Sequence, residues 1–202
     1  MDRVSNEKPR GRPRSFDRDK ALERAMHVFW RQGYEGTSVS DLTHAMGINP
    51  PSLYAAFGDK EQLYLEALGR YQKRRLESMA KWFKEEPTAK AAVRRLLTEA
   101  ARELARSGAP RGSMLVLSAT QCSAESLQPE LAERRASVRA ILEERIERGV
   151  REAELPRGTD SAALVDFYSA VFQGMSLQAR GGATRKRLLA IAETAMRAWP
   201  RG

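Results

Sequence analysis

Few residues of this sequence have the types and spacing that covalent catalysis or metal binding requires. The chain has one cysteine, Cys122, and two histidines, His27 and His44, which lie in separate segments without a cysteine or carboxylate cluster at ligand spacing. A single cysteine excludes an intrachain disulfide and a multi-cysteine zinc site. The sequence shows neither a nucleophile beside a base nor a carboxylate pair. It therefore predicts a protein that is not an enzyme and that holds no metal or cofactor.

Two interpretations of Cys122 stay open. In the simpler one it is a small buried hydrophobic residue. In the other it takes part in redox chemistry, which requires a lowered thiol pKa or a partner thiol from a second subunit. We interpret His27 and His44 as ordinary helix residues.

The chemistry that remains is non-covalent contact, and it centres on residues 47–63, which read GINPPSLYAAFGDKEQL. Asn49 is a favourable N-cap for a helix, and Pro50 occupies the first helical position, where a missing N–H costs nothing. Gly58 ends this helix after barely two turns. A helix that short buries little, so its role is expected to lie in contact with another molecule.

The two faces of this short helix differ in character. Leu53 and Phe57 are four residues apart and can both face inward, which leaves Ser52, Tyr54 and Ala55 outside. Small residues such as Ala55 permit close approach, and the Tyr54 hydroxyl can reach a phosphate or a base edge. The alternative is that Tyr54 is a half-buried core aromatic and that the two prolines only stop a loop.

Two helices are predicted before this one. The first covers residues 17–33, and the second begins at a capping box of Ser38 and Asp41 and stops at Gly47. Three helices with a tight turn before the last are typical of a helix-turn-helix, whose second element enters the major groove of DNA. Lys60, at the start of the next helix, is then placed to contact a phosphate.

The rest of the chain also shows helical periodicity, so the sequence predicts an all-α protein. A long fourth helix runs from residue 60 to about 84. Later helices are expected at 89–107, in an apolar segment from 113, and at 129–154, 160–179 and 184–199.

Composition agrees with a soluble helical protein, with 42% hydrophobic and 30% charged residues. No apolar run approaches the roughly 20 residues that a membrane span needs, and the basic N-terminus lacks the apolar core of a secretory signal. A cytoplasmic location is therefore expected. The net charge is +9, but residues 1–60 hold ten basic and eight acidic residues, so net charge alone argues weakly for DNA binding.

Residues 16–68 carry a resemblance to a known family: FDRDKALERAMHVFWRQGYEGTSVSDLTHAMGINPPSLYAAFGDKEQLYLEAL is similar to the DNA-binding domain of TetR family transcriptional regulators. The resemblance implies a flexible basic arm at residues 1–15, a helix-turn-helix domain at 16–60, and a helical ligand-binding and dimerisation domain at 61–202. The DNA contacts that it implies are Thr37, Ser38, Ser40, Pro50, Pro51, Ser52, Tyr54, Ala55 and Lys60.

The basic arm offers a second source of DNA affinity. Residues 10–14 spell RGRPR, which is like the core of an AT-hook, so Arg12 and Arg14 are predicted to follow an A·T-rich minor groove. The alternative is a solvated tail that lends only nonspecific attraction.

The resemblance also implies that the last two helices pair with a second copy and that a ligand cavity lies among the middle helices. The predicted pairing residues form two stripes at helical spacing: Leu164, Tyr168, Val171, Phe172 and Met175, then Leu188, Ala192, Ala195 and Trp199. The predicted cavity lining is Trp82, Phe83, Met114, Leu117, Ser118, Gln121, Cys122 and Phe167. Such stripes are also typical of an ordinary protein core.

These features together predict a homodimeric, sequence-specific transcriptional regulator that binds a palindromic operator in double-stranded DNA. It is expected to be a repressor released by a small-molecule effector of unknown identity. The alternative is an architectural DNA-binding protein that uses the AT-hook-like arm without an effector.

Overall fold

The computed structural model describes residues 16–200, and every regular element within that range is a helix, as predicted. The helices are α1 (Arg18–Gln32), α2 (Val39–Met46), α3 (Pro50–Phe57), α4 (Lys60–Glu85), α5 (Ala89–Leu104), α6 (Met114–Gln121), the short 3-10 helix η1 (Glu125–Leu127), α7 (Gln128–Arg151), α8 (Ser161–Arg180) and α9 (Arg185–Met196). None of the helices between residues 16 and 200 combines the length and the apolar character that crossing a membrane requires.

Side-chain caps begin the early helices at the predicted residues. Ser38 and Asp41 form the expected capping box, in which each side chain accepts a hydrogen bond from the backbone N–H of the other at 3.0 Å. Asn49, Asp59 and Thr88 cap α3, α4 and α5 by accepting from the N–H three residues further along. These bonds satisfy N–H groups that the first helical turn would leave without a partner.

Three helices end three residues earlier than the sequence predicts, and one of them is α7, which ends at Arg151 instead of residue 154. α5 ends at Leu104 instead of residue 107, ahead of a turn in which Gly108 adopts a positive φ of 77°. α9 ends at Met196, and residues 197–199 continue in tighter turns whose N–H groups bond to carbonyls three residues back. Trp199 is nevertheless buried, so the chain beyond α9 still contributes to the core.

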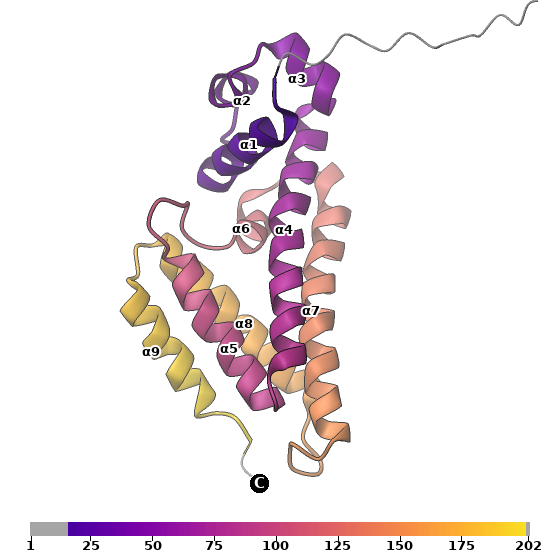
Figure 1. Cartoon of the computed structure of the whole chain (residues 1–202), viewed down its shortest axis with the longest axis vertical. Helices are drawn as coiled ribbons and strands as arrows, with labels where there is room; N and C mark the ends of the chain where they lie inside the picture. The colour runs from indigo at the N-terminus through magenta and orange to yellow at the C-terminus, as the bar shows by residue number, and fades with distance from the viewer. Residues whose placement is uncertain (1–15, 201–202) are drawn as a thin grey trace, which may run out of the picture.

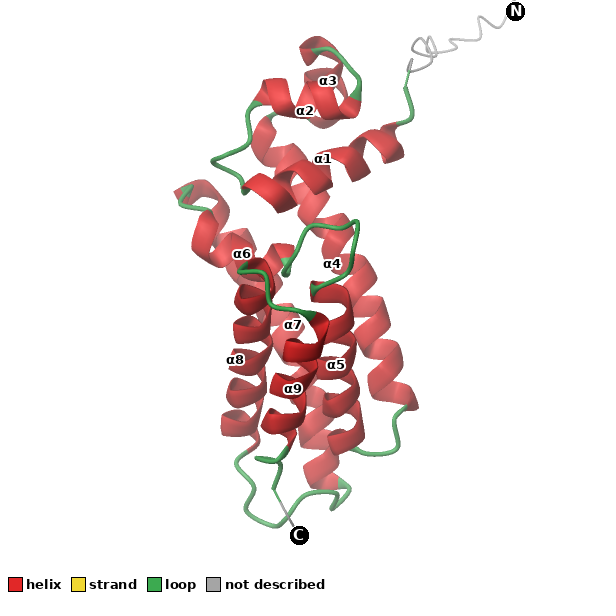
Figure 2. Cartoon of the chain, turned by 90° about the vertical axis from the view of Figure 1, so that its left-hand side faces the viewer, coloured by secondary structure: helices red, strands yellow, loops and turns green. Residues whose placement is uncertain are grey.

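The helices form an elongated molecule with α1, α2 and α3 gathered at one end (Figure 1). α4 starts among them and runs beside α7 toward the opposite end; its 26 residues span about 39 Å. α5, α8 and α9 pack against one another in the part of the molecule away from α1, α2 and α3 (Figure 2).

Two clusters of buried residues lie along this length. The N-terminal core joins α1–α4 with α6 and the start of α7, and includes Phe29, Leu42 and Leu63. The C-terminal core joins the second half of α4 with α5, α7, α8 and α9, and includes Met79 and Tyr168. α4 contributes buried residues to both cores and therefore connects them.

Candidate nucleic-acid interface

The turn between α2 and α3 depends on a glycine. Gly47 adopts the left-handed conformation with φ 70° and ψ 37°, and its N–H bonds to the carbonyls of Thr43 and His44 at the end of α2. L-residues with a side chain rarely adopt this conformation. Ile48 and Asn49 then complete the connection, so only three residues separate α2 from α3.

α3 presents one face to the core and the other to solvent. Leu53 and Phe57 are buried, as their spacing predicts. On the other side Tyr54 is 51% exposed, which excludes the alternative of a core aromatic. Pro50, Pro51 and Ala55 are also exposed, and Ser52 is partly exposed. Apart from Tyr54, the outward surface of α3 therefore carries only small side chains.

The residues around the start of α2 divide into exposed and buried ones. Ser38 and Ser40 are exposed, and hydrogen bonds from Ser38 lower the pKa of Asp41 in the capping box. Thr37 is 1% exposed, and its hydroxyl donates to the Gly33 carbonyl at 2.6 Å. Thr37 therefore stabilises the turn after α1. Its buried side chain is not available to contact DNA, so the prediction that it does so is wrong.

Lys60 lies under the connection between α1 and α2. Its Nζ atom donates to the carbonyls of Tyr34 and Thr37 at 3.0 Å each, and it lies 4.2 Å from the centre of the Tyr34 ring. The ammonium group has three N–H donors, so these two bonds leave one. Lys60 thus fixes the loop that leads into α2.

Arg18 holds α3 from behind. Its guanidinium donates to the Ala56 carbonyl at 3.0 Å and to Glu66 at 2.7 Å, and it lies 4.3 Å from the centre of the Phe57 ring. These contacts join α1, α3 and α4 through one side chain. Sequence spacing did not indicate this role, because the partners are 38 and 48 residues away.

A second charge cluster joins α1 to α4. Glu23 accepts hydrogen bonds from Arg70 at 2.7 Å and from Arg74 at 3.1 Å. Burial raises the pKa of Glu23, but the bonds from the two guanidinium groups outweigh it and hold this pKa below its ordinary value. α1 is thus bound to α4 by packing and by ion pairs, which orients the α2–α3 unit relative to the rest of the chain.

Arg12 and Arg14 of the predicted minor-groove arm lie outside the described residues, so their contribution stays a prediction.

A cavity of about 550 Å³ lies among α4, α6, α7 and α8. Its apolar wall includes Leu76, Met79 and Trp82 of α4, and α6 contributes Val116 and Thr120. This volume is in the range of pockets that bind small organic ligands.

Of the predicted cavity residues, only Trp82 lines this space. Four others face the opposite side of α6, where they enclose a much smaller gap against Phe29, Trp30 and Tyr64: these are Met114, Leu117, Ser118 and Gln121. The predicted ligand face of α6 therefore packs against the N-terminal core, and the opposite face, with Val116 and Thr120, lines the cavity.

Phe83, Cys122 and Phe167 also lie away from the cavity. Phe83 is part of the C-terminal core, and Phe167 is 41% exposed. Cys122 is buried in the N-terminal core, where desolvation raises its pKa. A redox role through a lowered pKa requires the opposite shift, and burial keeps the thiol away from a partner thiol of a second subunit. Both observations favour the interpretation of Cys122 as a buried hydrophobic residue.

The predicted pairing stripes on α8 and α9 lie inside the chain. Most of their residues are buried in the C-terminal core, and the rest are partly buried against it: the buried ones are Tyr168, Met175, Leu188, Ala192, Ala195 and Trp199, and the partly buried ones are Leu164, Val171 and Phe172. The six buried residues cannot also form a surface for a second copy while the core stays intact, whereas Leu164, Val171 and Phe172 keep part of their surface exposed.

A different stripe on α8 is exposed. Phe167 is 41% and Leu177 is 48% exposed, and Ala163, Ala170 and Gly174 complete a row at helical spacing. α9 and the turn that follows it add a narrower exposed row of Ala190, Thr194 and Ala198. The sequence contained a signal for the α8 row. Positions 163, 167, 170, 174 and 177 follow the helical spacing i, i+4, i+7, i+11 and i+14, and small residues are interspersed there with two large apolar ones.

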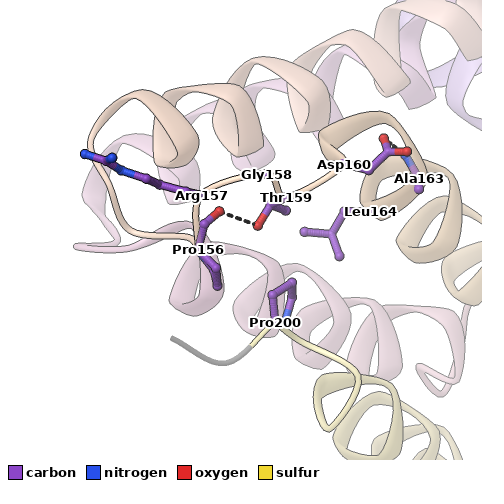
Figure 3. Close-up of a pocket in the computed structure, with 8 residues that line it drawn as sticks. All are labelled: Pro156, Arg157, Gly158, Thr159, Asp160, Ala163, Leu164 and Pro200. Carbon is purple, nitrogen blue, oxygen red and sulfur yellow. Dashed lines mark hydrogen bonds between the residues drawn. The ribbon is translucent and has the colours of Figure 1, made fainter.

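A shallow hollow of about 380 Å³, drawn in Figure 3, lies at the end of the molecule opposite α3 (Figure 1). Its polar groups already serve local structure. The Thr159 hydroxyl donates to the Pro156 carbonyl at 2.8 Å, and the Asp160 carboxylate caps α8 by accepting from the Ala163 N–H. We assign no ligand to this hollow.

Residues 21–67 match the sequence model of a family described as bacterial regulatory proteins, tetR family. Over 196 residues the chain is 36% identical to the HTH-type transcriptional repressor ComR of Escherichia coli (strain K12). This aligned region covers 96% of the present chain and 93% of ComR. The chain is 29% identical over 185 residues to the repressor BdcR of the same organism, covering 92% and 90% of the two chains.

A similar solved structure is that of a cysteine mutant of the TetR family transcriptional regulator CifR complexed with 26bp double-strand operator DNA. Its TM-score is 0.89 at 44% sequence identity, covering 94% of this chain and all of the other.

Proposed function

Because this chain belongs to the TetR family of bacterial regulatory proteins, we propose that it is a dimeric transcriptional repressor, released from a palindromic operator by a small molecule. The observation that carries the proposal is the outward face of α3, where Tyr54 is 51% exposed while Leu53 and Phe57 are buried behind it. A short helix with this orientation fits the major groove, which is about 12 Å wide. The relatives named above are repressors, and the similar structure holds operator DNA.

The proposed reading surface is the outer side of α3 together with the start of α2. Pro50, Pro51, Ser52 and Ala55 would face bases, with Ser40 beside them. No arginine, asparagine or glutamine lies between residues 50 and 57. Specificity would therefore come from apolar contact with thymine methyl groups and from the shape of the DNA.

Phosphate contacts would orient this surface on the duplex. The Tyr54 hydroxyl and the exposed Ser38 are two candidates, and the remaining N–H donor of Lys60 is a third. Such contacts carry no sequence information but set the register of α3 in the groove.

The exposed row on α8 would form the centre of the dimer. Phe167 and Leu177 are large apolar side chains exposed to water, and the small residues of the same row, Ala163, Ala170 and Gly174, allow a partner helix to approach closely. Two copies related by a twofold axis would present two α3 helices to half-sites about 34–36 Å apart.

α6 would carry the effect of a ligand to the DNA-binding helices. One face of α6 lines the cavity, and the other packs on Phe29 and Trp30 of α1. Immediately before α6, the Gly112 carbonyl accepts a hydrogen bond from the indole N–H of Trp30 at 3.0 Å. A ligand that displaced α6 would therefore move α1 and, with it, α2 and α3.

The proposal involves binding alone, without catalysis, and it places the protein with the chromosome in the cytoplasm. No observation on residues 16–200 favours an architectural role without an effector, and the cavity favours a ligand.

Selection of bound duplexes from a random pool, followed by footprinting, tests the proposal. The expected result is a palindrome with two protected half-sites about one helical turn apart. Diffuse protection of A·T-rich DNA without twofold symmetry would contradict it and would support the architectural alternative.

A further inference from the structure

The cavity among α4, α6, α7 and α8 has a distinctive charge. Three arginines line it, Arg75 from α4 and Arg135 and Arg139 from α7, against a single carboxylate, Asp166. The remaining wall is largely apolar, with Trp82 and Leu142 among its residues. The cavity thus combines an apolar volume with an excess of positive charge.

One of the three arginines is already neutralised. The Arg139 guanidinium donates to Asp166 at 2.9 Å and to Glu143 at 2.7 Å. These bonds raise the pKa of Arg139, with the bond to Asp166 contributing most. The only carboxylate in the cavity lining is therefore committed to Arg139 and does not offer a site for a cation.

The other two arginines lack such partners. Neither Arg75 nor Arg135 forms an ion pair or a side-chain hydrogen bond with any residue between 16 and 200. The Nη1 atom of Arg135 is buried without an acceptor. The adjacent Arg134 also has a buried Nε atom without an acceptor, but its guanidinium is paired with Glu130 at 2.7 Å and with the Gln72 side chain at 3.1 Å, whereas Arg135 has no such partner.

A buried guanidinium donor without an acceptor is costly, and native structures usually supply a partner. A carboxylate or phosphate is the natural one, because its oxygens match the planar fork of donors on arginine. A cation would meet uncompensated positive charge, and a neutral apolar molecule would leave the Arg135 donor without a partner.

We propose that this cavity binds a small organic anion, with its carboxylate or phosphate head held by Arg75 and Arg135 and its apolar body against Trp82 and Leu142. The volume of about 550 Å³ accommodates a molecule of drug-like size. The inference rests on the proposed function, since it names the chemical class of the effector that releases the repressor.

Calorimetric titration of the full chain with four probes that share one eight-carbon tail tests this inference. The probes are octanoate, octyl phosphate, octanol and octylamine. Octanoate or octyl phosphate is expected to bind at least about tenfold more tightly than octanol and octylamine, because a charge-assisted hydrogen bond is lost with the head group. Comparison of the two anions shows which head group is preferred.

Variants assign the effect to the two arginines. Arg75→Met and Arg135→Met are each expected to weaken binding of the preferred anion about tenfold and to leave octanol binding unchanged. Lys73→Met is the control, because Lys73 is an exposed residue of α4 outside the cavity lining. Thermal melting shows that each variant is folded. Equal affinities for all four probes, no binding of either anion, or insensitivity to both arginine variants would overturn the inference.

Operator binding by the wild-type chain, measured without any probe, separates this inference from the proposed function. Operator binding together with failure of the anions would overturn only the ligand class. Anion binding together with absence of operator binding would overturn the repressor function and leave the site standing.

Discussion

Tyr54 and Lys60 show how a residue's role depends on the acceptors that surround it. Tyr54 has a free outward position on α3, whereas the Lys60 ammonium is directed to two backbone carbonyls of the loop before α2. Sequence spacing placed both near DNA. It could not show that Tyr34 and Thr37, 26 and 23 residues away, supply acceptors for Lys60.

Tyr54→Phe is expected to weaken binding to the operator and to an unrelated duplex by a similar factor of about ten, because the variant loses one hydrogen bond to a phosphate. The slope of affinity against salt should change little, since no positive charge is lost. Fluorescence anisotropy at several salt concentrations measures both quantities.

The matched control is Tyr34→Phe, which deletes a hydroxyl from the loop after α1. Burial raises the pKa of Tyr34 to about 12, and this residue is not among the outward residues of α3. Its operator affinity should equal that of the wild type. A loss of affinity confined to the operator in Tyr54→Phe would show that Tyr54 reads bases instead of contacting phosphate.

For α8, the hydrophobic pattern of the sequence alone did not show which face is exposed. Its most apolar face, with Tyr168 and Met175, packs in the C-terminal core, and its exposed face carries Phe167 and Leu177 among small residues. Both faces have helical periodicity. Only the packing of α5, α7 and α9 around α8 decides which of them is turned outward.

Phe167→Asp is expected to convert the dimer into a monomer at micromolar concentration. A carboxylate buried without a partner at the interface costs about 3 kcal/mol or more, which weakens association at least about 100-fold. Sedimentation equilibrium measures the association constant. Ala80→Asp, which places the same charge on an exposed residue of α4, should stay dimeric. A Phe167→Asp variant that remained a dimer would place the interface elsewhere.

The sequence was sufficient for the parts of the fold that depend on local signals. Helix starts at Ser38, Asn49 and Asp59 follow from side chains that cap the next turn, and the inward orientation of Leu53 and Phe57 follows from spacing within a single helix. The cavity could not be predicted in the same way. Its walls come mainly from four helices far apart in the chain, with Leu96 of α5 as a further contact, and the position of each wall depends on packing.

At the scale of the whole molecule, Glu35 joins the DNA-binding helices to the turn after α6. One carboxylate oxygen accepts from the N–H and hydroxyl of Ser123, at 2.7 and 2.9 Å, and from the N–H of Ala124 at 3.2 Å. Burial raises the pKa of Glu35, but these hydrogen bonds outweigh it and lower the pKa below its ordinary value of 4.5. The ionised carboxylate therefore stabilises this junction.

Glu35→Gln is expected to lower the melting temperature at pH 7, because a neutral amide accepts these bonds more weakly. A lowered folded-state pKa stabilises the native state above the unfolded pKa, and this contribution is lost as pH falls through the folded value. The difference between wild type and variant should therefore disappear in acid. Calorimetry from pH 7 to pH 3 measures it, and Glu144→Gln, at an exposed residue of α7, is the control. A constant difference across this range would exclude the carboxylate charge as the cause.

Ala170 and Leu177 belong both to the wall of the cavity and to the exposed row on α8. Any molecule that presses on these two side chains acts on a surface where two subunits would meet. Ligand binding in the cavity and dimerisation would then be thermodynamically linked. Each would change the equilibrium constant of the other process by the same factor. The concentration of the protein in the cell would therefore determine how much ligand is needed for release from the operator.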